Sequence, residues 1–190
     1  MGESTGGVER NEILAHVLAK DSQHPQDEPL IASNINEQLQ HMGLSTWSIS
    51  LQRRLRDAVG RLQPKTLLEV GASIGHRTAW LMDLFEREQR TLQALTLVEQ
   101  GGKFGVILKR LLQRYDALDW STVVVGDPER LAAEHQAWKL ASATATELSQ
   151  TPFEPAYDVI VVDGPSSVRA ELVSTYLPPV SYTHLRAHET

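Results

Sequence analysis

The chain of 190 residues contains no cysteine. This absence excludes disulfide bonds, thiolate nucleophiles and zinc sites built on thiolates. No apolar stretch approaches the roughly 18 residues that a membrane span needs, and the N-terminus lacks the basic segment and apolar run of a secretory signal. We therefore expect a cytoplasmic protein without a membrane partner.

Positive charge is also scarce: 18 Lys and Arg residues face 24 Asp and Glu residues, which gives a formal net charge of −6. Such a molecule has no overall attraction to nucleic acid, so no nucleic-acid partner is expected. The seven histidines are scattered and form no HExxH motif. His135 and Trp138, three residues apart on one predicted helix face, indicate packing rather than a functional site.

The first 63 residues predict helices without strands, and we interpret them as an N-terminal helical appendage (residues 1–63). Apolar residues at helical spacing predict the helices, and a segment rich in prolines and acids predicts a loop or hinge between them. The expected elements are a helix over 8–19, a loop over 21–33, and a second helix that starts near Ser45 or Thr46, either of which can cap it, and ends before Pro64.

After Pro64 short apolar runs alternate with longer helical patterns. Strands separated by helices favour right-handed βαβ crossovers and a parallel sheet, which places the chain in the α/β class with a Rossmann-like architecture. The expected strands are 66–70, 93–98, 121–125 and 157–162, and the expected helices are 75–89, 102–115, 128–148 and 166–176.

The C-terminal decapeptide SYTHLRAHET, residues 181–190, has neither strand alternation nor a helical apolar stripe. It resembles translated sequencing-adapter read-through, so we expect a non-native tail there. The Rossmann-like domain is then residues 64–180 and is incomplete, truncated after the fourth strand and its helix. Such a sheet exposes an edge beside the fourth strand, which invites association, so the sequence is compatible with an oligomer.

Four acidic residues mark the ends of the four predicted strands: Glu69, Glu99, Asp127 and Asp163. In a parallel sheet all carboxyl ends face one crevice, which is where ligands bind. Glu99 follows the glycine turn at a separation along the sequence that suits an acceptor for ribose hydroxyls. Asp127 could accept from an adenine amino group or cap the helix that follows it.

The glycine pattern of the first turn distinguishes between cofactors. A pyrophosphate binder needs G-x-G-x-x-G, whereas this turn reads Gly71-Ala-Ser-Ile-Gly75 and lacks the middle glycine. The turn also contains no lysine, which excludes a P-loop. A diphosphate ligand is therefore disfavoured.

The pattern Glu69-x-Gly71-x-x-x-Gly75-x-x-Thr78 resembles motif I of class I S-adenosylmethionine-dependent methyltransferases, nearest to the small-molecule O-methyltransferases of the catechol and caffeoyl-CoA type. Leu97-Val98-Glu99 resembles their ribose-binding motif, and the segment from Tyr157 to Asp163 resembles their fourth-strand motif. The resemblance implies S-adenosylmethionine as cofactor and a methyl transfer to a small-molecule acceptor. The cofactor-binding residues it implies are Glu69, Gly71, Ala72, Ser73, Gly75, Thr78, Glu99, Gln100 and Asp127.

A hydroxyl acceptor needs a proton acceptor, for which Asp163 is the first candidate and His76 the second. A solvent-facing helix position is the simpler interpretation of His76. In the catechol-type branch the aspartate matching Asp163 ligates a divalent metal, but Gly164 and Pro165 depart from the usual residues there. The need for a divalent metal therefore stays open from the sequence, with Asp163 as the candidate ligand.

Two other functions remain open from the sequence. A nicotinamide-dependent oxidoreductase would share Glu99 and the sheet, although it normally has the middle glycine that this turn lacks. A non-catalytic nucleoside-binding fragment is the other alternative, because truncation is expected to limit turnover.

Overall fold

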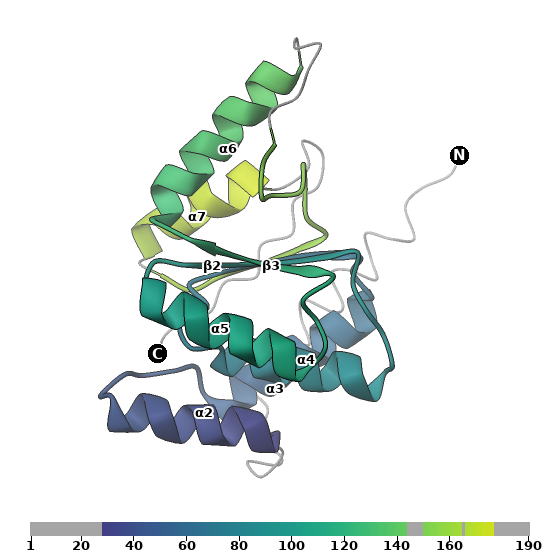
Figure 1. The fold of residues 1–190 in the computed structure, drawn as a ribbon, viewed down its shortest axis with the longest axis vertical. Coiled ribbons are helices and arrows are strands. Elements are labelled where there is room, and N and C mark those ends of the chain that lie inside the picture. The colour runs from purple at the N-terminus through teal and green to yellow at the C-terminus, as the bar shows by residue number, and fades with distance from the viewer. Residues whose placement is uncertain (1–27, 144–149, 165, 177–190) are drawn as a thin grey trace. The chain divides into compact units, whose positions relative to one another are not determined.

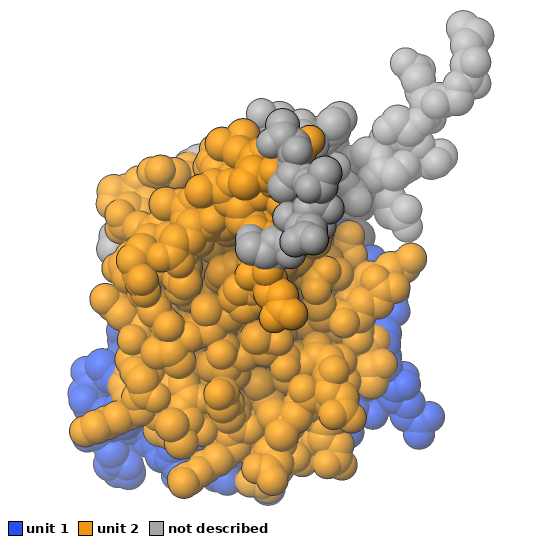
Figure 2. Space-filling model, turned by 45° about the horizontal axis from the view of Figure 1, so that its top comes forward, with its two compact units in different colours: residues 1–63, 76–90, 185–190 blue, residues 64–75, 91–184 orange. Residues whose placement is uncertain are grey.

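The computed structural model describes residues 28–143, 150–164 and 166–176. The chain divides into two compact units, coloured blue and orange in Figure 2. The first comprises Met1–Gln63, His76–Arg90 and Leu185–Thr190, and the second comprises Pro64–Gly75 and Thr91–His184. The predicted helix over 8–19 and the tail over 181–190 lie outside the described residues. Among the described helices, none is both long and apolar enough to cross a membrane.

Helix α2 (Leu30–His41) begins inside the segment for which the sequence predicted a loop. Pro29 immediately precedes the helix, and its carbonyl oxygen accepts a hydrogen bond from the Ser33 N–H at 2.8 Å. Proline suits a helix start because its fixed φ, here −57°, matches the backbone there. The N–H group that proline lacks would have no hydrogen-bond partner within the helix at this position. The predicted loop over 21–33 is therefore wrong from Leu30 onward.

Helix α3 (Ile49–Leu62) starts later than predicted, because Ser48 caps it rather than Ser45 or Thr46. The Ser48 hydroxyl accepts a hydrogen bond from the Leu51 N–H at 3.3 Å. Several hydroxyl residues lie close together here, and each could cap a helix by its chemistry alone. Only the position of the first turn selects among them.

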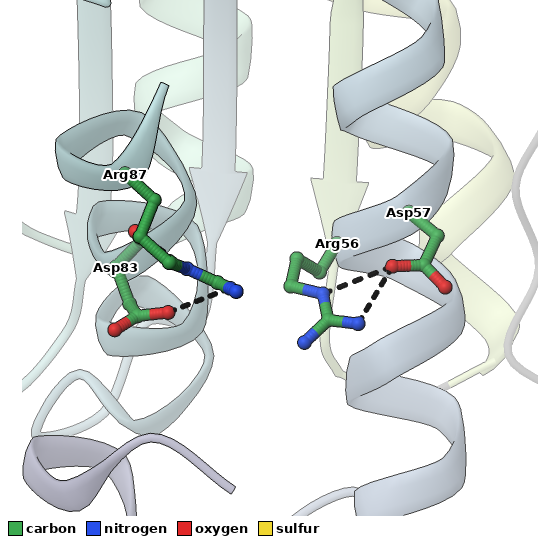
Figure 3. A network of polar contacts seen from close by, with 4 residues as sticks. All are labelled: Arg56, Asp57, Asp83 and Arg87. Carbon is green, nitrogen blue, oxygen red and sulfur yellow. Dashed lines mark hydrogen bonds and ion pairs between the residues drawn. The ribbon is translucent and has the colours of Figure 1, made fainter. Parts of the chain in front are cut away.

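Helix α4 (His76–Arg87) completes the described helices of the first unit, where α2 and α3 both pack against it. Two ion pairs of these helices are shown in Figure 3. Asp83 and Arg87 pair at 2.7 Å across one turn of α4, and Arg56 pairs with the adjacent Asp57 at 2.8 Å on α3. Partly exposed pairs of this kind contribute little to stability, so apolar packing holds these helices together.

The second unit contains a four-stranded parallel sheet in the order β3-β2-β1-β4. Within the described residues β4 pairs with β1 alone. The register places Val70 opposite Val98 on one side and Val162 on the other. The parallel topology predicted from the alternating pattern is confirmed. The strands are β1 (Thr66–Val70), β2 (Ala94–Glu99), β3 (Ser121–Val125) and β4 (Val159–Val162).

The helices of this unit lie on both faces of the sheet (Figure 1): α5 (Gly102–Arg114) on one face, and α6 (Pro128–Ser142) and α7 (Ser166–Tyr176) on the other. Gly105 lets α5 approach β3, since a Cβ there would lie 2.5 Å from a methyl group of Val125. On the other face, α6 and α7 pack together and α7 contacts β4. Their buried side chains form one core with the inner residues of β1, β2 and β4.

This arrangement determines where a ligand can bind. The chain passes from β1 to β2 on one side of β1, while β4 pairs on the other side. A parallel sheet of this kind has a crevice at the carboxyl ends of the strands where the order reverses. The residues that follow β1 and β4 therefore meet at this point.

Candidate functional site

The turn after β1 has an unusual backbone. Gly71 and Gly75 adopt φ values of +78° and +92°, and Ser73, which is not a glycine, adopts +53°. The N–H groups of Gly71 and Ala72 both donate to the carbonyl oxygen of Val98, at 2.9 and 3.2 Å. The turn is thus fastened to the end of β2 by its backbone.

Glu99, the last residue of β2, is 8% exposed and reaches the same turn with its side chain. One carboxylate oxygen, Oε2, accepts a hydrogen bond from the Ser73 N–H at 2.7 Å. The other, Oε1, accepts from the Gly101 N–H at 2.8 Å. A single carboxylate therefore joins the turn after β1 to the turn after β2.

Asp127 lies directly after β3, and its side chain caps α6. Its Oδ1 accepts a hydrogen bond from the Arg130 N–H at 2.8 Å, and Pro128 occupies the first helical position. Proline and aspartate are both favoured at these positions of a helix. Of the two roles that the sequence allowed for Asp127, the structural one is therefore present, and the adenine-binding one stays a prediction.

Replacing Asp127 with alanine is expected to lower the free energy of unfolding by about 1 kcal/mol, because the cap of α6 is lost. Asp127→Ser, whose hydroxyl can still accept from the Arg130 N–H, is expected to keep most of this stability. Urea unfolding of both variants measures the difference. Equal stability of the alanine variant and the wild type would show that the cap contributes nothing, and cofactor affinity of the serine variant tests the adenine role separately.

A crevice of about 330 Å³ opens at the carboxyl ends of the strands. We call it the strand-end crevice. Four of its lining residues are acidic and none is lysine or arginine. Val168 and Leu172 of α7 give it an apolar wall. The complete lining is Val70, Gly71, Glu99, Gln100, Asp127, Pro128, Glu129, Asp163, Gly164, Val168 and Leu172.

The predicted site residues fall into three groups. Those that line the strand-end crevice are Gly71, Glu99, Gln100, Asp127 and Asp163. Those in the same unit that do not line it are Glu69, Ala72, Ser73 and Gly75, of which Glu69 is completely buried in β1. His76 and Thr78 belong to α4 and so to the other unit.

His76 is 2% exposed, so the interpretation as a solvent-facing helix residue is wrong. Its Nε2 lies 2.6 Å from Oε1 of Glu28, and its Nδ1 lies 2.6 Å from the hydroxyl of Thr46 and 3.2 Å from the amide nitrogen of Gln52. Burial lowers the pKa of His76 below its usual 6.5, against the hydrogen bond to Glu28, which raises it. Glu28, Thr46 and Gln52 thus surround both ring nitrogens of His76, while the Gln52 Oε1 itself has no hydrogen-bond partner within the described residues.

Sequence reasoning missed several residues of the strand-end crevice. Glu129 follows Pro128 in the first turn of α6, where an acid is also expected for the helix dipole alone, so its presence gave no distinct signal. Val168 and Leu172 are spaced by four positions on α7, which predicts an apolar stripe but not what the stripe faces.

The described residues contain no group of three or more His, Asp or Glu side chains that could hold a metal ion. Asp163 lines the strand-end crevice without two further donors beside it in this part of the chain. The donor set that a divalent metal prefers is therefore not provided by these residues.

Comparison with known proteins identifies the fold. No protein-family model matches the chain, and no curated protein matches it in sequence. Solved structures do match: an O-methyltransferase of Bacillus cereus in complex with SAH has a TM-score of 0.56 at 16% identity, over 90% of this chain and 68% of that protein. TomG of Streptomyces achromogenes, an O-methyltransferase of tomaymycin synthesis in complex with SAM, has a TM-score of 0.57 at 13% identity, over 93% and 71%.

A Staphylococcus aureus protein assigned as a caffeoyl-CoA O-methyltransferase is similar as well, with a TM-score of 0.55 at 12% identity, over 89% of this chain and 66% of that protein. The chain thus spans about two thirds of the length of these proteins. At such low identity the likeness establishes the fold alone. The Rossmann-like fold, of the kind seen in these O-methyltransferases, is therefore confirmed.

Proposed function

We propose that this chain is an S-adenosylmethionine-dependent methyltransferase that acts on a hydroxyl group of a small molecule in the cytoplasm. The observation that carries the proposal is the strand-end crevice, which presents Glu99 at the end of β2 and has four acidic residues but no basic one in its lining. The fold, shared with O-methyltransferases, supports the same conclusion.

The charge of the strand-end crevice argues against a diphosphate. Glu99, Asp127, Glu129 and Asp163 all line it, and phosphate groups would meet these four carboxylates, with no lysine or arginine among the described residues of the lining. Carboxylates instead favour a positively charged ligand at short range. A sulfonium meets this requirement, whereas the pyrophosphate of a nicotinamide dinucleotide does not.

The residues present fit the parts of S-adenosylmethionine. Glu99 can accept from ribose hydroxyls with the lone pairs that Ser73 and Gly101 leave unused. Val168 and Leu172 supply an apolar wall for a flat base, and Asp127 or Glu129 can accept from an amino group at its edge. The backbone of Gly71 lines the strand-end crevice, and because this residue has no side chain the turn after β1 can lie close to the carbonyl oxygen of Asp163.

When bound, the cofactor would supply a methyl group on a cationic sulfur: the acceptor oxygen would form a bond to the methyl carbon as the carbon–sulfur bond breaks, and the neutral thioether would leave. The protein then has to hold the acceptor oxygen in line with the methyl carbon and exclude water. We assign to Asp163 the role of the base that accepts the proton of the acceptor hydroxyl. This residue follows β4, is half-buried and lines the strand-end crevice. His76, the second candidate from the sequence, belongs to the other unit and does not line this crevice, so we do not assign it this role.

Isothermal titration of the folded chain with S-adenosylhomocysteine is expected to give saturable binding at one site, while NADH is expected to give none. Circular dichroism provides the control that the protein is folded under the same conditions. Binding of NADH without S-adenosylhomocysteine would favour the oxidoreductase instead. Binding of S-adenosylhomocysteine without methyl release from S-adenosylmethionine, tested with a panel of small hydroxyl compounds, would favour the non-catalytic binder.

A further inference from the structure

We propose that Glu99 is a positioning residue as well as a ligand: its carboxylate holds the turn of residues 71–75 in the conformation that receives the cofactor. This inference rests on the proposed function for its consequence in binding. The positioning itself can be observed in the protein without any ligand.

The hydrogen bonds of Glu99 carry the argument. Ser73 and Gly101 belong to turns that follow different strands, and each donates its N–H to a different oxygen of the same carboxylate, at 2.7 and 2.8 Å. With 8% exposure, the Glu99 side chain is largely shielded from water. Hydrogen bonds to a charged acceptor under these conditions are stronger than those between neutral groups.

The turn needs such a partner because of its backbone. Ser73 adopts a φ of +53°, a conformation that costs a residue with a Cβ free energy unless its surroundings impose it. The hydrogen bond that Glu99 Oε2 accepts comes from the N–H group of Ser73, which is the strained residue itself. The Glu99 carboxylate is thus placed to offset the strain of the turn.

Glutamine is the informative replacement for Glu99. Its side chain has the same size, but it offers one acceptor oxygen and one N–H₂ donor where the carboxylate offers two acceptors. One of the two backbone N–H groups would face another donor. The variant Glu99→Gln therefore releases at least one of the turns while it keeps the shape of the side chain.

Glu129→Gln provides a matched control. Glu129 lines the same strand-end crevice and loses the same charge by the same chemical change, yet its side chain makes no hydrogen bond within the described residues. Any effect of crevice charge alone should therefore appear in both variants. An effect on the turn should appear only in Glu99→Gln.

The first experiment measures amide hydrogen exchange by NMR in the ligand-free full chain. In Glu99→Gln the amide of Ser73, of Gly101 or of both is expected to exchange about tenfold faster or more, while the amides of β1 and β2 stay unchanged. Glu129→Gln is expected to leave both turn amides at the wild-type rate. Unchanged exchange at Ser73 and Gly101 in Glu99→Gln would overturn the proposal.

The second experiment separates positioning from ribose contact by isothermal titration with S-adenosylhomocysteine and its 2′,3′-dideoxy analogue. If Glu99 only accepts from ribose hydroxyls, Glu99→Gln leaves the affinity for the dideoxy analogue at the wild-type value. If it also positions the turn, that affinity falls about tenfold, and more than in Glu129→Gln. Equal dideoxy affinities in wild type and Glu99→Gln would overturn the role in binding.

The two failures can be told apart. Wild-type protein that binds neither compound contradicts the proposed function, while the exchange experiment still decides whether Glu99 positions the turn. Should Glu99→Gln not fold, Glu99→Asp keeps the charge but is one methylene shorter. It is expected to release one of the two amides, and protection of both at the wild-type level would overturn the proposal.

Discussion

Alanine at position 71 is expected to lower the free energy of unfolding by about 3 to 5 kcal/mol, through backbone strain and overpacking together. A Cβ on Gly71 would lie 2.3 Å from the backbone carbonyl oxygen of Asp163, and the φ of +78° is unfavourable for alanine as well. Because the contact is with backbone, no side chain can rotate away to relieve it. Urea unfolding of Gly71→Ala against the wild type measures the loss.

Gly102→Ala is the matched control, because a Cβ there would meet no atom within 4 Å and Gly102 begins α5. Alanine is favoured over glycine in helices, so this variant is expected to be as stable as the wild type or slightly more so. A Gly71→Ala protein that unfolds at the same urea concentration as Gly102→Ala would contradict the close approach of β1 and β4 at this point.

The titration of His135 by itself is expected to lower the free energy of unfolding by about 3 kcal/mol as the pH is lowered from 7 to below 4. His135 is 1% exposed, and neither ring nitrogen has a hydrogen-bond partner within the described residues. Burial, with a smaller contribution from the positive charge of Lys139, lowers the pKa of His135 from 6.5 to about 4.

The sign follows from proton linkage. The unfolded chain takes up a proton at His135 near pH 6.5, whereas the folded protein resists it until about pH 4. The contribution of neutral His135 to the free energy of unfolding is therefore fully present above pH 6.5. It is lost progressively as the pH falls toward 4. The rings around it explain the resistance: Trp138, Phe153 and Tyr176 have centroids 5.7, 5.3 and 5.1 Å away.

His135→Phe provides the comparison, since phenylalanine fills a similar space and does not titrate in this range. Urea unfolding of the wild type and of this variant at pH 7 and pH 4.5 gives the difference attributable to His135. The variant is expected to lose less stability than the wild type over this interval. Equal losses would show that His135 is accessible to protons in the folded protein.

Much of the second unit could be predicted from the sequence. The four strands and the helices between them follow from local patterns, because the alternation of apolar runs with helical stretches is repeated along the chain. Parallel pairing then follows from the crossover connections, which leave few other topologies. The packing interpretation of His135 and Trp138 is confirmed by their stacked rings. The first unit was predicted less well, since the start of helix α2, residues 30–33, was interpreted as part of a loop.

The candidate site was predicted in its chemistry but not in its contacts. Acidic residues at strand ends can be identified from the sequence, and Glu99, Asp127 and Asp163 do line one crevice. That Glu99 holds Ser73, 26 positions away, depends on the path of two turns in space. In the same way, the pairing of His76 with Glu28 joins residues 48 positions apart and could not be found from their spacing.

The sequence by itself therefore determined the class of fold and the acidic character of the strand ends, because periodicity, glycines and strand-closing acids are local properties of the chain. Only the tertiary structure decided which hydrogen-bonding groups meet, which glycine has no space for a Cβ, and which histidines are buried. These depend on distances between segments that are remote in sequence, and the local pattern of residues does not contain those distances.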